Sequence, residues 1–375
     1  MISSLRFLPP SRGAVRATAL AATLVLSLAA CGGGGGGTTT APIDTIPTPT
    51  ATQYLNPVLN ADFPDPAVMH AGDGSYYAFA TQTTGVRLQV ARSGDLVAWT
   101  PLGEALPTRP TWVSPTSNFF APDVEPRDGH YVMYYAANVS DAARTKPNDD
   151  FCIGMATSAT PAGPYTDVGH PVTCGSTFTT IDPMGFDDPQ TGKRYLYWGS
   201  AGVPLMVQEL AADRASFAAG STPIPLVPVR SGGGGYDTGL IEGPWVTYNA
   251  PYYYLYFSGN GCCGAGAHYA VMVARSTSPT GPFEVLKDGS GAAQTILAPS
   301  GKWLAPGHNS TIRDGAGVEW MLYHAIDSFN PYLIPGNTNI SRRPMMLDRI
   351  TYVNGWPTVG VGGQPSATPQ TRPTP

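Results

Sequence analysis

Four acidic residues stand beside prolines where strand-like segments begin, and their spacing is nearly constant. Asp65 lies in FPDPAV, Asp123 in APDV, Asp182 in IDPMGF and Glu242 in IEGPWV. They follow one another after 58, 59 and 60 residues, and a polar opening with His308, in APGHNSTI, comes 66 residues later. Paired carboxylates that face one pocket are what acid–base hydrolysis of an acetal requires. The pattern therefore indicates glycosidic chemistry, provided that the fold brings these side chains together.

The segments after these openings repeat as well. Each opening leads into an aromatic-rich run, and the runs are YYAFAT, YVMYYAA, YLYWGS, YYYLYFSG and EWMLYHA. About five β-units of similar length indicate a solenoid, an array or a propeller. In a propeller the first strand of each blade lines the central channel, so equivalent strand openings converge on one axis. The sequence therefore predicts an all-β fold, a five-bladed β-propeller with its active site in the central channel.

Taken singly, each acid has a simpler explanation. An aspartate before a proline is commonly a turn residue whose side chain bonds nearby backbone. The shared position in the repeat favours a common centre instead. Glycoside hydrolysis needs one acid that stays protonated near neutral pH and one carboxylate that stays ionised, and a third carboxylate nearby raises the pKa of the acid. Three carboxylates in one channel therefore have a chemical reason to lie together.

The N-terminal region predicts export. Residues 1–31 combine the basic residues Arg6, Arg12 and Arg16 with an apolar stretch over 17–30, as in a secretory signal. The stretch ends in LAAC, which resembles a bacterial lipobox and predicts lipidation of Cys31; an ordinary cleaved signal is the alternative. We therefore expect an exported bacterial lipoprotein anchored in the outer membrane, since Gly32 rather than Asp follows the cysteine, with its orientation left open.

The rest of the chain divides by composition. Residues 32–53 are a Gly/Thr/Pro-rich linker, 54–363 the propeller domain, and 364–375 a Pro/Thr-biased tail expected to be disordered. Charged residues make up 13% of the chain and the net charge is −5, which argues against nucleic acid as a partner. A monomer is the default expectation.

Four cysteines remain in the domain, which allows three pairings. Cys152 and Cys174 flank what looks like one strand, turn and return, and their disulfide is the favoured pairing. The adjacent Cys262 and Cys263 have two interpretations, a vicinal disulfide or two small apolar residues in a Gly-rich loop.

The openings NPVLNADFPDPAV, FFAPDV, TIDP, IEGPW and PGHNS, with the closing RRPMMLDRITYVNGWPTV, resemble the family 43 glycoside hydrolases over about residues 56–360. The resemblance implies a five-bladed propeller that acts with inversion on arabinan, arabinoxylan and related plant polymers. It also implies the roles of the acids: Asp65 is the general base, Asp182 the acid that modulates pKa and orientation, and Glu242 the general acid. Asp123 matches a position outside these three and is expected to be structural.

The resemblance extends to binding residues and implies no organic cofactor. It gives His308 a part in holding a calcium ion or its waters, against the simpler view of a packing histidine. It gives Arg343 contacts to substrate hydroxyls, with the neighbouring Arg342 as the alternative. Phe120, with Phe119, and Trp198 are candidate sugar platforms, and ordinary blade packing is the alternative for each.

One stretch of the sequence bears on which polysaccharide is the substrate. CCGAGAHYAVMVARSTSPTGPF is similar to the double-cysteine segment of endo-acting arabinanases, although Gly243 and the loop 265–268 depart from that branch. We therefore expect a lipid-anchored, inverting hydrolase of α-1,5-linked arabinan. The alternatives are an exo-acting α-L-arabinofuranosidase or β-xylosidase of the same fold, a non-catalytic glycan-binding propeller, and a structural or protein-binding lipoprotein.

Overall fold

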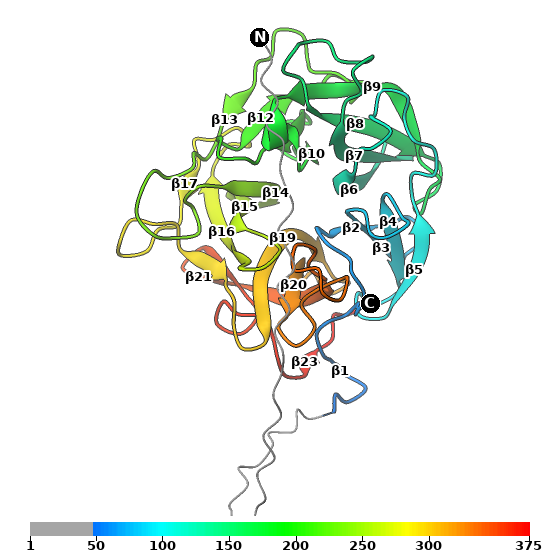
Figure 1. Cartoon of the computed structure of the whole chain (residues 1–375). Helices are drawn as coiled ribbons and strands as arrows, with labels where there is room; N and C mark the ends of the chain where they lie inside the picture. Colours follow the sequence, from blue (N-terminus) through cyan, green and yellow to red (C-terminus); the bar gives the residue numbers. More distant parts are fainter. Residues whose placement is uncertain (1–47) are drawn as a thin grey trace, which may run out of the picture. The chain divides into compact units, whose positions relative to one another are not determined.

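The computed structural model describes residues 48–375, which fold almost entirely into β-strands (Figure 1). The signal segment, Cys31 and most of the linker lie outside the described residues. Five sheets follow one another along the chain, each built from consecutive strands. The only helical element in the described part is the short 3-10 turn η1 (Thr177–Thr180). None of the helices described there is long and apolar enough to cross a membrane.

The strands of the five blades are as follows. The first blade contains β2 (Ala67–His70), β3 (Tyr76–Ala80), β4 (Gln89–Ser93) and β5 (Trp99–Glu104). The second contains β6 (Phe119–Arg127), β7 (His130–Asn138), β8 (Phe151–Ser158) and β9 (Thr166–Gly175). The third contains β10 (Met184–Asp187), β11 (Arg194–Trp198), β12 (Met206–Glu209) and β13 (Ile224–Pro225). The fourth contains β14 (Ile241–Asn249), β15 (Tyr252–Gly261), β16 (His268–Ser276), β17 (Glu284–Val285) and β18 (Thr295–Leu297). The fifth contains β19 (Trp303–Arg313), β20 (Glu319–Asp327), β21 (Met345–Val353) and β22 (Trp356–Val359).

The first strands of the five blades form a closed ring. In turn β2, β6, β10, β14 and β19 each contact the next, and β19 contacts β2 again. Figure 1 shows the sheets arranged around this centre, with the later strands of each blade farther out. The prediction of an all-β, five-bladed propeller is therefore confirmed.

The aromatic-rich runs are the second strands of the blades, and they fill the spaces between sheets. Tyr256 and Phe257 on β15 and Tyr323 on β20 are completely buried, as is Tyr197 on β11. A strand covered by a neighbouring sheet on each face buries both of its faces, so these runs are apolar or aromatic throughout rather than alternating. Each such ring stabilises the fold by about 1.5–3 kcal/mol through burial.

A disulfide joins β8 to β9. Cys152 and Cys174 are directly opposite each other in the antiparallel pair, and their sulfur atoms are bonded. The favoured pairing is therefore confirmed.

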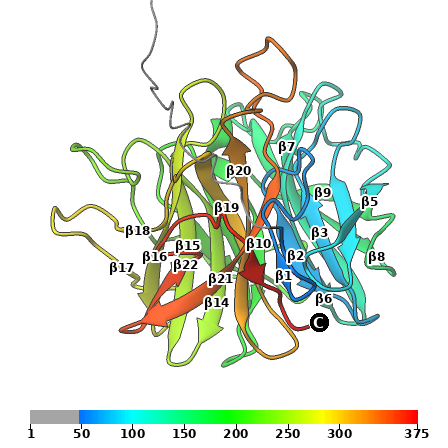
Figure 2. The ribbon, with the colours of Figure 1, turned by 90° about the horizontal axis from the view of Figure 1, so that it is seen from below.

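The C-terminal tail is ordered against the propeller, which corrects the expectation of disorder for residues 364–375. Strand β23 (Gln370–Thr371) pairs with β1 (Gln53–Tyr54), and Figure 2 shows the C-terminus near β1. Ser366 is 1% exposed, and Arg372 forms an ion pair with Asp95 at 2.9 Å. Composition suggested a frayed end because prolines and threonines bury little, but hydrogen bonds to the N-terminal segment and the fifth blade hold the tail in place.

Candidate active site

All five strand openings meet in one narrow pocket on the propeller axis. Its lining includes Asp65, Asp123 and Asp182 from the first three blades, Gly243 beside the fourth carboxylate, and His308 from the fifth blade. The ring of first strands places these residues together although more than 240 positions separate the first from the last. The structure thus brings together the positions that the repeat spacing singled out.

A local backbone feature turns these side chains toward the channel. Each opening has a residue with positive φ, and these are Asp65 at 57°, Ala121 at 37°, Asp182 at 59°, Gly243 at 61° and His308 at 49°; the fifth opening has a second, Ala305 at 46°. Only glycine adopts this region freely, and another residue held there costs on the order of 1–3 kcal/mol. The recurrence of the strained position in every blade, next to the polar groups, indicates that the kink serves the pocket rather than the sheets.

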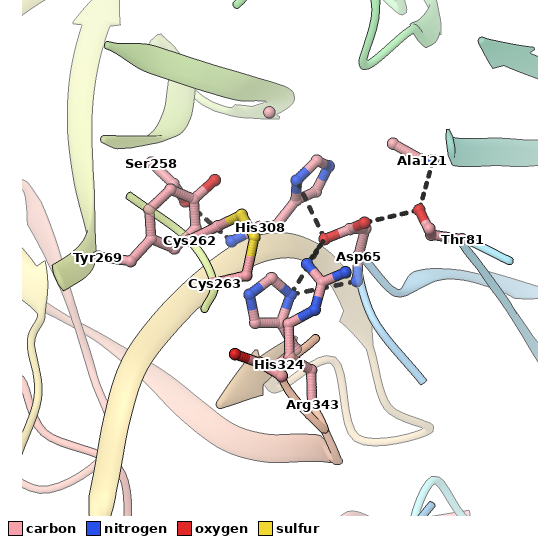
Figure 3. A network of polar contacts seen from close by, with 12 residues as sticks. Asp65, Thr81, Ala121, Ser258, Cys262, Cys263, Tyr269, His308, His324 and Arg343 are labelled. Carbon is pink, nitrogen blue, oxygen red and sulfur yellow. Dashed lines mark hydrogen bonds and ion pairs between the residues drawn. A yellow bond between two sulfur atoms is a disulfide. The ribbon is translucent and has the colours of Figure 1, made fainter. Parts of the chain in front are cut away.

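Asp65 lies in a cationic setting (Figure 3). Its Oδ1 accepts a hydrogen bond from Arg343 at 3.0 Å and lies 3.4 Å from Nδ1 of His308 and 3.1 Å from Nδ1 of His324. Thr81 donates to its Oδ2 at 2.6 Å. Although burial acts to raise it, the guanidinium of Arg343, and then the imidazole of His308, hold the pKa of Asp65 well below its ordinary value. Asp65 is therefore a carboxylate that stays ionised.

Asp182 and Glu242 form a contrasting carboxyl pair. Ser200 donates to Glu242 Oε2 at 2.7 Å, and Tyr269 donates to Oε1 at 2.8 Å. The backbone N–H of Gly243 donates to Asp182 Oδ2 at 3.0 Å. Complete burial, and then the nearby charge of Glu242, raise the pKa of Asp182 well above its ordinary value. The pair therefore holds a proton at a pH where Asp65 is charged.

One pocket thus contains an ionised carboxylate and a carboxyl pair that retains a proton. Environments that push the pKa values of neighbouring acids apart assign one group to accept a proton and another to donate one. An inverting glycosidase uses such a set, because a carboxylate activates water on one face of the sugar while an acid protonates the leaving oxygen on the other.

The model of the family described as glycosyl hydrolases family 43 matches residues 54–357. The chain belongs to that family. It is 33% identical over 317 residues to the probable arabinan endo-1,5-alpha-L-arabinosidase C of Aspergillus niger, covering 79% of this chain and 91% of that protein. It is 30% identical over 313 residues to the probable arabinan endo-1,5-alpha-L-arabinosidase A of Aspergillus clavatus, covering 79% and 90%. The fold resembles that of an exo-1,5-alpha-L-arabinanase from a bovine ruminal metagenomic library, with a TM-score of 0.65 at 24% identity, over 81% of this chain and 99% of that one.

In this family 43 chain the two candidate arginines differ in direction. Arg343 reaches inward to Asp65, whereas Arg342 bonds the backbone and side-chain oxygens of Asn60 near the surface. The Nε atom of Arg343 is buried and has no hydrogen-bond partner within residues 48–375. Of the two, only Arg343 contacts a carboxylate of the pocket.

The two aromatic residues expected to be sugar platforms, Trp198 and Phe120, also lie in different surroundings. Trp198 is only 7% exposed and packs against Phe217 in the cluster between the second and third blades. It is a packing residue, so the expectation of a sugar platform is not supported there. Phe120 is half-buried and contacts Phe178, which is 46% exposed on η1. Phe178, which no sequence motif marked, extends this aromatic surface to solvent.

Three side chains of this family 43 pocket form a cluster that could hold a cation. Ligand atoms of Asp182, Glu242 and His308 all lie within 4.8 Å of one another. Ca²⁺ takes six to eight ligands, mostly oxygen. Two carboxylates and one imidazole fall short of that number, so these residues fit a calcium ion only with several coordinating waters.

The adjacent cysteines form a vicinal disulfide beside the pocket (Figure 3). Cys262 packs on the cluster that contains Tyr269, and the next backbone N–H, of Gly264, donates to Ser341 Oγ at 2.7 Å. Of the two open interpretations, the structure therefore has the disulfide. The hydrogen bond from Gly264 to Ser341 links the loop after β15 to the loop that leads into Arg343.

Sequence reasoning missed the partners of the acids. Thr81, Ser200, Tyr269 and His324 all contact a carboxylate of the pocket, yet none of them opens a first strand. Two of them could have been marked by position, because His324 is the penultimate residue of the aromatic run EWMLYHA and Tyr269 follows the double-cysteine loop.

Proposed function

We propose that this family 43 hydrolase cleaves α-1,5-L-arabinofuranosidic linkages of plant arabinan with inversion of the anomeric centre. The opposed environments of Asp65 and of the Asp182–Glu242 pair carry this proposal, because they provide a base and an acid in one pocket. The arabinan endo-1,5-alpha-L-arabinosidases among its relatives support the linkage.

In the proposed reaction Asp65 takes a proton from a water molecule, which attacks the anomeric carbon. Glu242 gives a proton to the glycosidic oxygen as the bond to the leaving sugar breaks. Asp182 lies beside Glu242, and the repulsion between the two carboxyl groups keeps a proton in the pair. Arg343 holds the ionised base in place through its hydrogen bond to Asp65 Oδ1.

The deciding experiment is hydrolysis of defined substrates by the purified full chain. We would incubate it with debranched arabinan, arabinoxylan, and the nitrophenyl arabinoside and xyloside, and separate products over time by chromatography. A ladder of arabino-oligosaccharides is the expected result. Free arabinose or xylose alone would replace the proposal by the exo-acting alternative, and binding without any product would replace it by a glycan-binding propeller.

We also propose that His308 helps to hold a calcium ion through its waters, near Asp182 and Glu242. The ion would add positive charge beside the two carboxyl groups, and no proton transfer described above depends on it. A cation that binds only the folded state raises the melting temperature. Chelation by EDTA should lower that temperature and CaCl₂ should restore it; an unchanged melting temperature would leave His308 as a packing residue.

Finally, we propose that the protein is a monomeric lipoprotein of the bacterial outer membrane, attached through Cys31. The basic segment, the short apolar stretch and the LAAC sequence support the anchor. Cys31→Ser should move the protein from the membrane fraction to the soluble fraction. Light scattering of that variant measures its mass, and a dimer would contradict the monomer.

A further inference from the structure

We propose that His324 and Tyr269 form a stacked spacer that sets the position of the base Asp65 relative to the acid Glu242. The inference rests on the roles proposed above for the two carboxylates. Neither ring belongs to a strand opening, and both are completely buried. They are positioning residues, because their contacts are with the acids.

His324 holds the backbone of Asp65. The Asp65 N–H donates to His324 Nδ1 at 3.1 Å, and no other acceptor for this N–H lies within residues 48–375. The same nitrogen lies 3.1 Å from Oδ1 of Asp65. Burial lowers the pKa of His324 to about 4, so the ring is neutral and its Nδ1 lone pair can accept this hydrogen bond.

The hydrogen bond from the Asp65 N–H to His324 lies at a residue whose backbone is strained. Asp65 has φ of 57°, a conformation that aspartate adopts at a cost. A buried N–H without a partner would add about 1–3 kcal/mol to that cost. His324 therefore offsets the strain that turns the base toward the channel.

Tyr269 extends the support to the acid. Its ring is parallel to that of His324, with an interplanar angle of 3° and centroids 5.9 Å apart, and its hydroxyl donates to Glu242. In the view of Figure 3 both rings lie on the side of Asp65 where the disulfide is drawn. Gly307 permits this placement, because a Cβ there would lie 2.4 Å from the Tyr269 ring.

A rigid link between the two carboxylates matters for inversion. The reaction needs room for one water between base and sugar, and a displacement of about 1 Å can cost 10²-fold in rate. The two rings that link Asp65 to Glu242 are completely buried, so we expect a shift of either acid to disturb the stack.

The test compares two replacements of His324 in the full chain. His324→Asn keeps an acceptor near the position of Nδ1, whereas His324→Leu keeps volume without an acceptor. His130→Asn and His130→Leu, at the exposed first residue of β7, are the matched controls. We would measure kcat and KM on debranched arabinan and on the nitrophenyl arabinoside, with the melting temperature of each variant.

We expect His324→Leu to lower kcat about 10–100-fold on both substrates, the range seen when outer partners of a functional site are removed. His324→Asn should recover most of that loss. Tyr269→Phe, which keeps the ring, should lower kcat on arabinan more than on the nitrophenyl substrate. Tyr269→Leu, which removes the stack, should lower it on both.

Several outcomes would contradict the proposed role of His324 and Tyr269 as a spacer. One is equal kcat for His324→Asn and His324→Leu; another is a loss of kcat in Tyr269→Leu confined to arabinan, as in Tyr269→Phe. A melting temperature that falls while kcat of the folded protein stays at the wild-type value would reduce His324 to a packing residue. A wild-type chain inactive on both substrates overturns the proposed function itself, and the spacer with it.

Discussion

Arg343 and Asp65 meet at 3.0 Å although 278 residues separate them. Asp65 opens the first blade, and Arg343 precedes β21 in the last, so this ion pair is made only when the ring of blades closes. The charge that keeps the proposed base ionised therefore depends on completion of the fold. A fragment that lacks the fifth blade would retain the carboxylate without its cation.

Replacing Arg343 by Met should shift the acidic limb of the pH profile of kcat/KM to higher pH. The guanidinium lowers the pKa of Asp65, so its removal raises that pKa. Because the base acts only when ionised, activity is lost earlier as pH falls. Arg342→Met, which leaves the pocket untouched, is the control. An unshifted limb in the Arg343 variant would contradict the role of this charge.

Glu242→Gln should lower kcat on debranched arabinan by about 10²–10⁴-fold, the usual contribution of a general acid. The loss should be much smaller on the nitrophenyl arabinoside, because nitrophenolate leaves without protonation. Rates on the two substrates, compared with those of the exposed control Glu284→Gln, measure the difference. Equal losses on both would show that Glu242 has another role.

Asp65→Asn should be equally impaired on both substrates, because attack by water is required whatever the leaving group. We expect a loss of about 10²–10⁴-fold in kcat. Proton NMR of the first product of the wild-type protein should show the inverted anomer. Retention would mean that a carboxylate acts as nucleophile and would refute the assignment of Asp65 as base.

Asp123→Asn should stabilise the protein above neutral pH. Burial raises the pKa of Asp123 to about 7, and the Gly185 N–H donates to its Oδ2 at 2.7 Å. An unfolded aspartate has a pKa of about 3.9, so folding stability falls as pH rises from about 4 to 7 and is lower by a constant amount above that. Asparagine stays neutral and keeps an acceptor for Gly185.

Thermal unfolding at pH 4 and pH 8 tests whether ionisation of Asp123 lowers the stability of the fold. The variant should match the wild type at pH 4 and melt higher at pH 8, while Asp141→Asn, at an exposed position, should show no difference at either pH. A variant less stable than the wild type at pH 8 would mean that the charged form of Asp123 is favoured by the fold.

The blade count and the convergence of the acids could be predicted because both follow from a repeat period of about 60 residues. Strands in equivalent positions of a propeller reach the same axis whatever their side chains, so spacing alone placed Asp65 and Asp182 in one pocket. Strand register decides which face of a blade an aromatic side chain occupies, and the spacing of the repeats does not specify that register. Trp198 therefore looked like a platform and is a packing residue.

The partners of the acids could not be predicted for a related reason. Tyr269 and His324 come from second and third strands, and they reach the pocket only because Gly307 lets one ring lie against β19. No local motif records such a contact. The order of residues 364–375 could not be predicted from composition, because composition indicates only how much apolar surface a segment can bury. The hydrogen-bond partners of these residues lie in distant parts of the chain.

Deletion of residues 364–375 should destabilise the propeller. Ser366 accepts from Asn56 at 2.9 Å, and its N–H donates to Asp348 Oδ2 at 3.1 Å, both in buried surroundings. Each lost hydrogen bond costs about 1 kcal/mol, and more where a buried carboxylate loses a donor. We expect roughly 2–3 kcal/mol less free energy of unfolding in denaturant titrations. Ser366→Ala, which keeps the backbone N–H, should lose about half as much. Wild-type stability in the truncated chain would mean that the contacts of the tail add nothing to the fold.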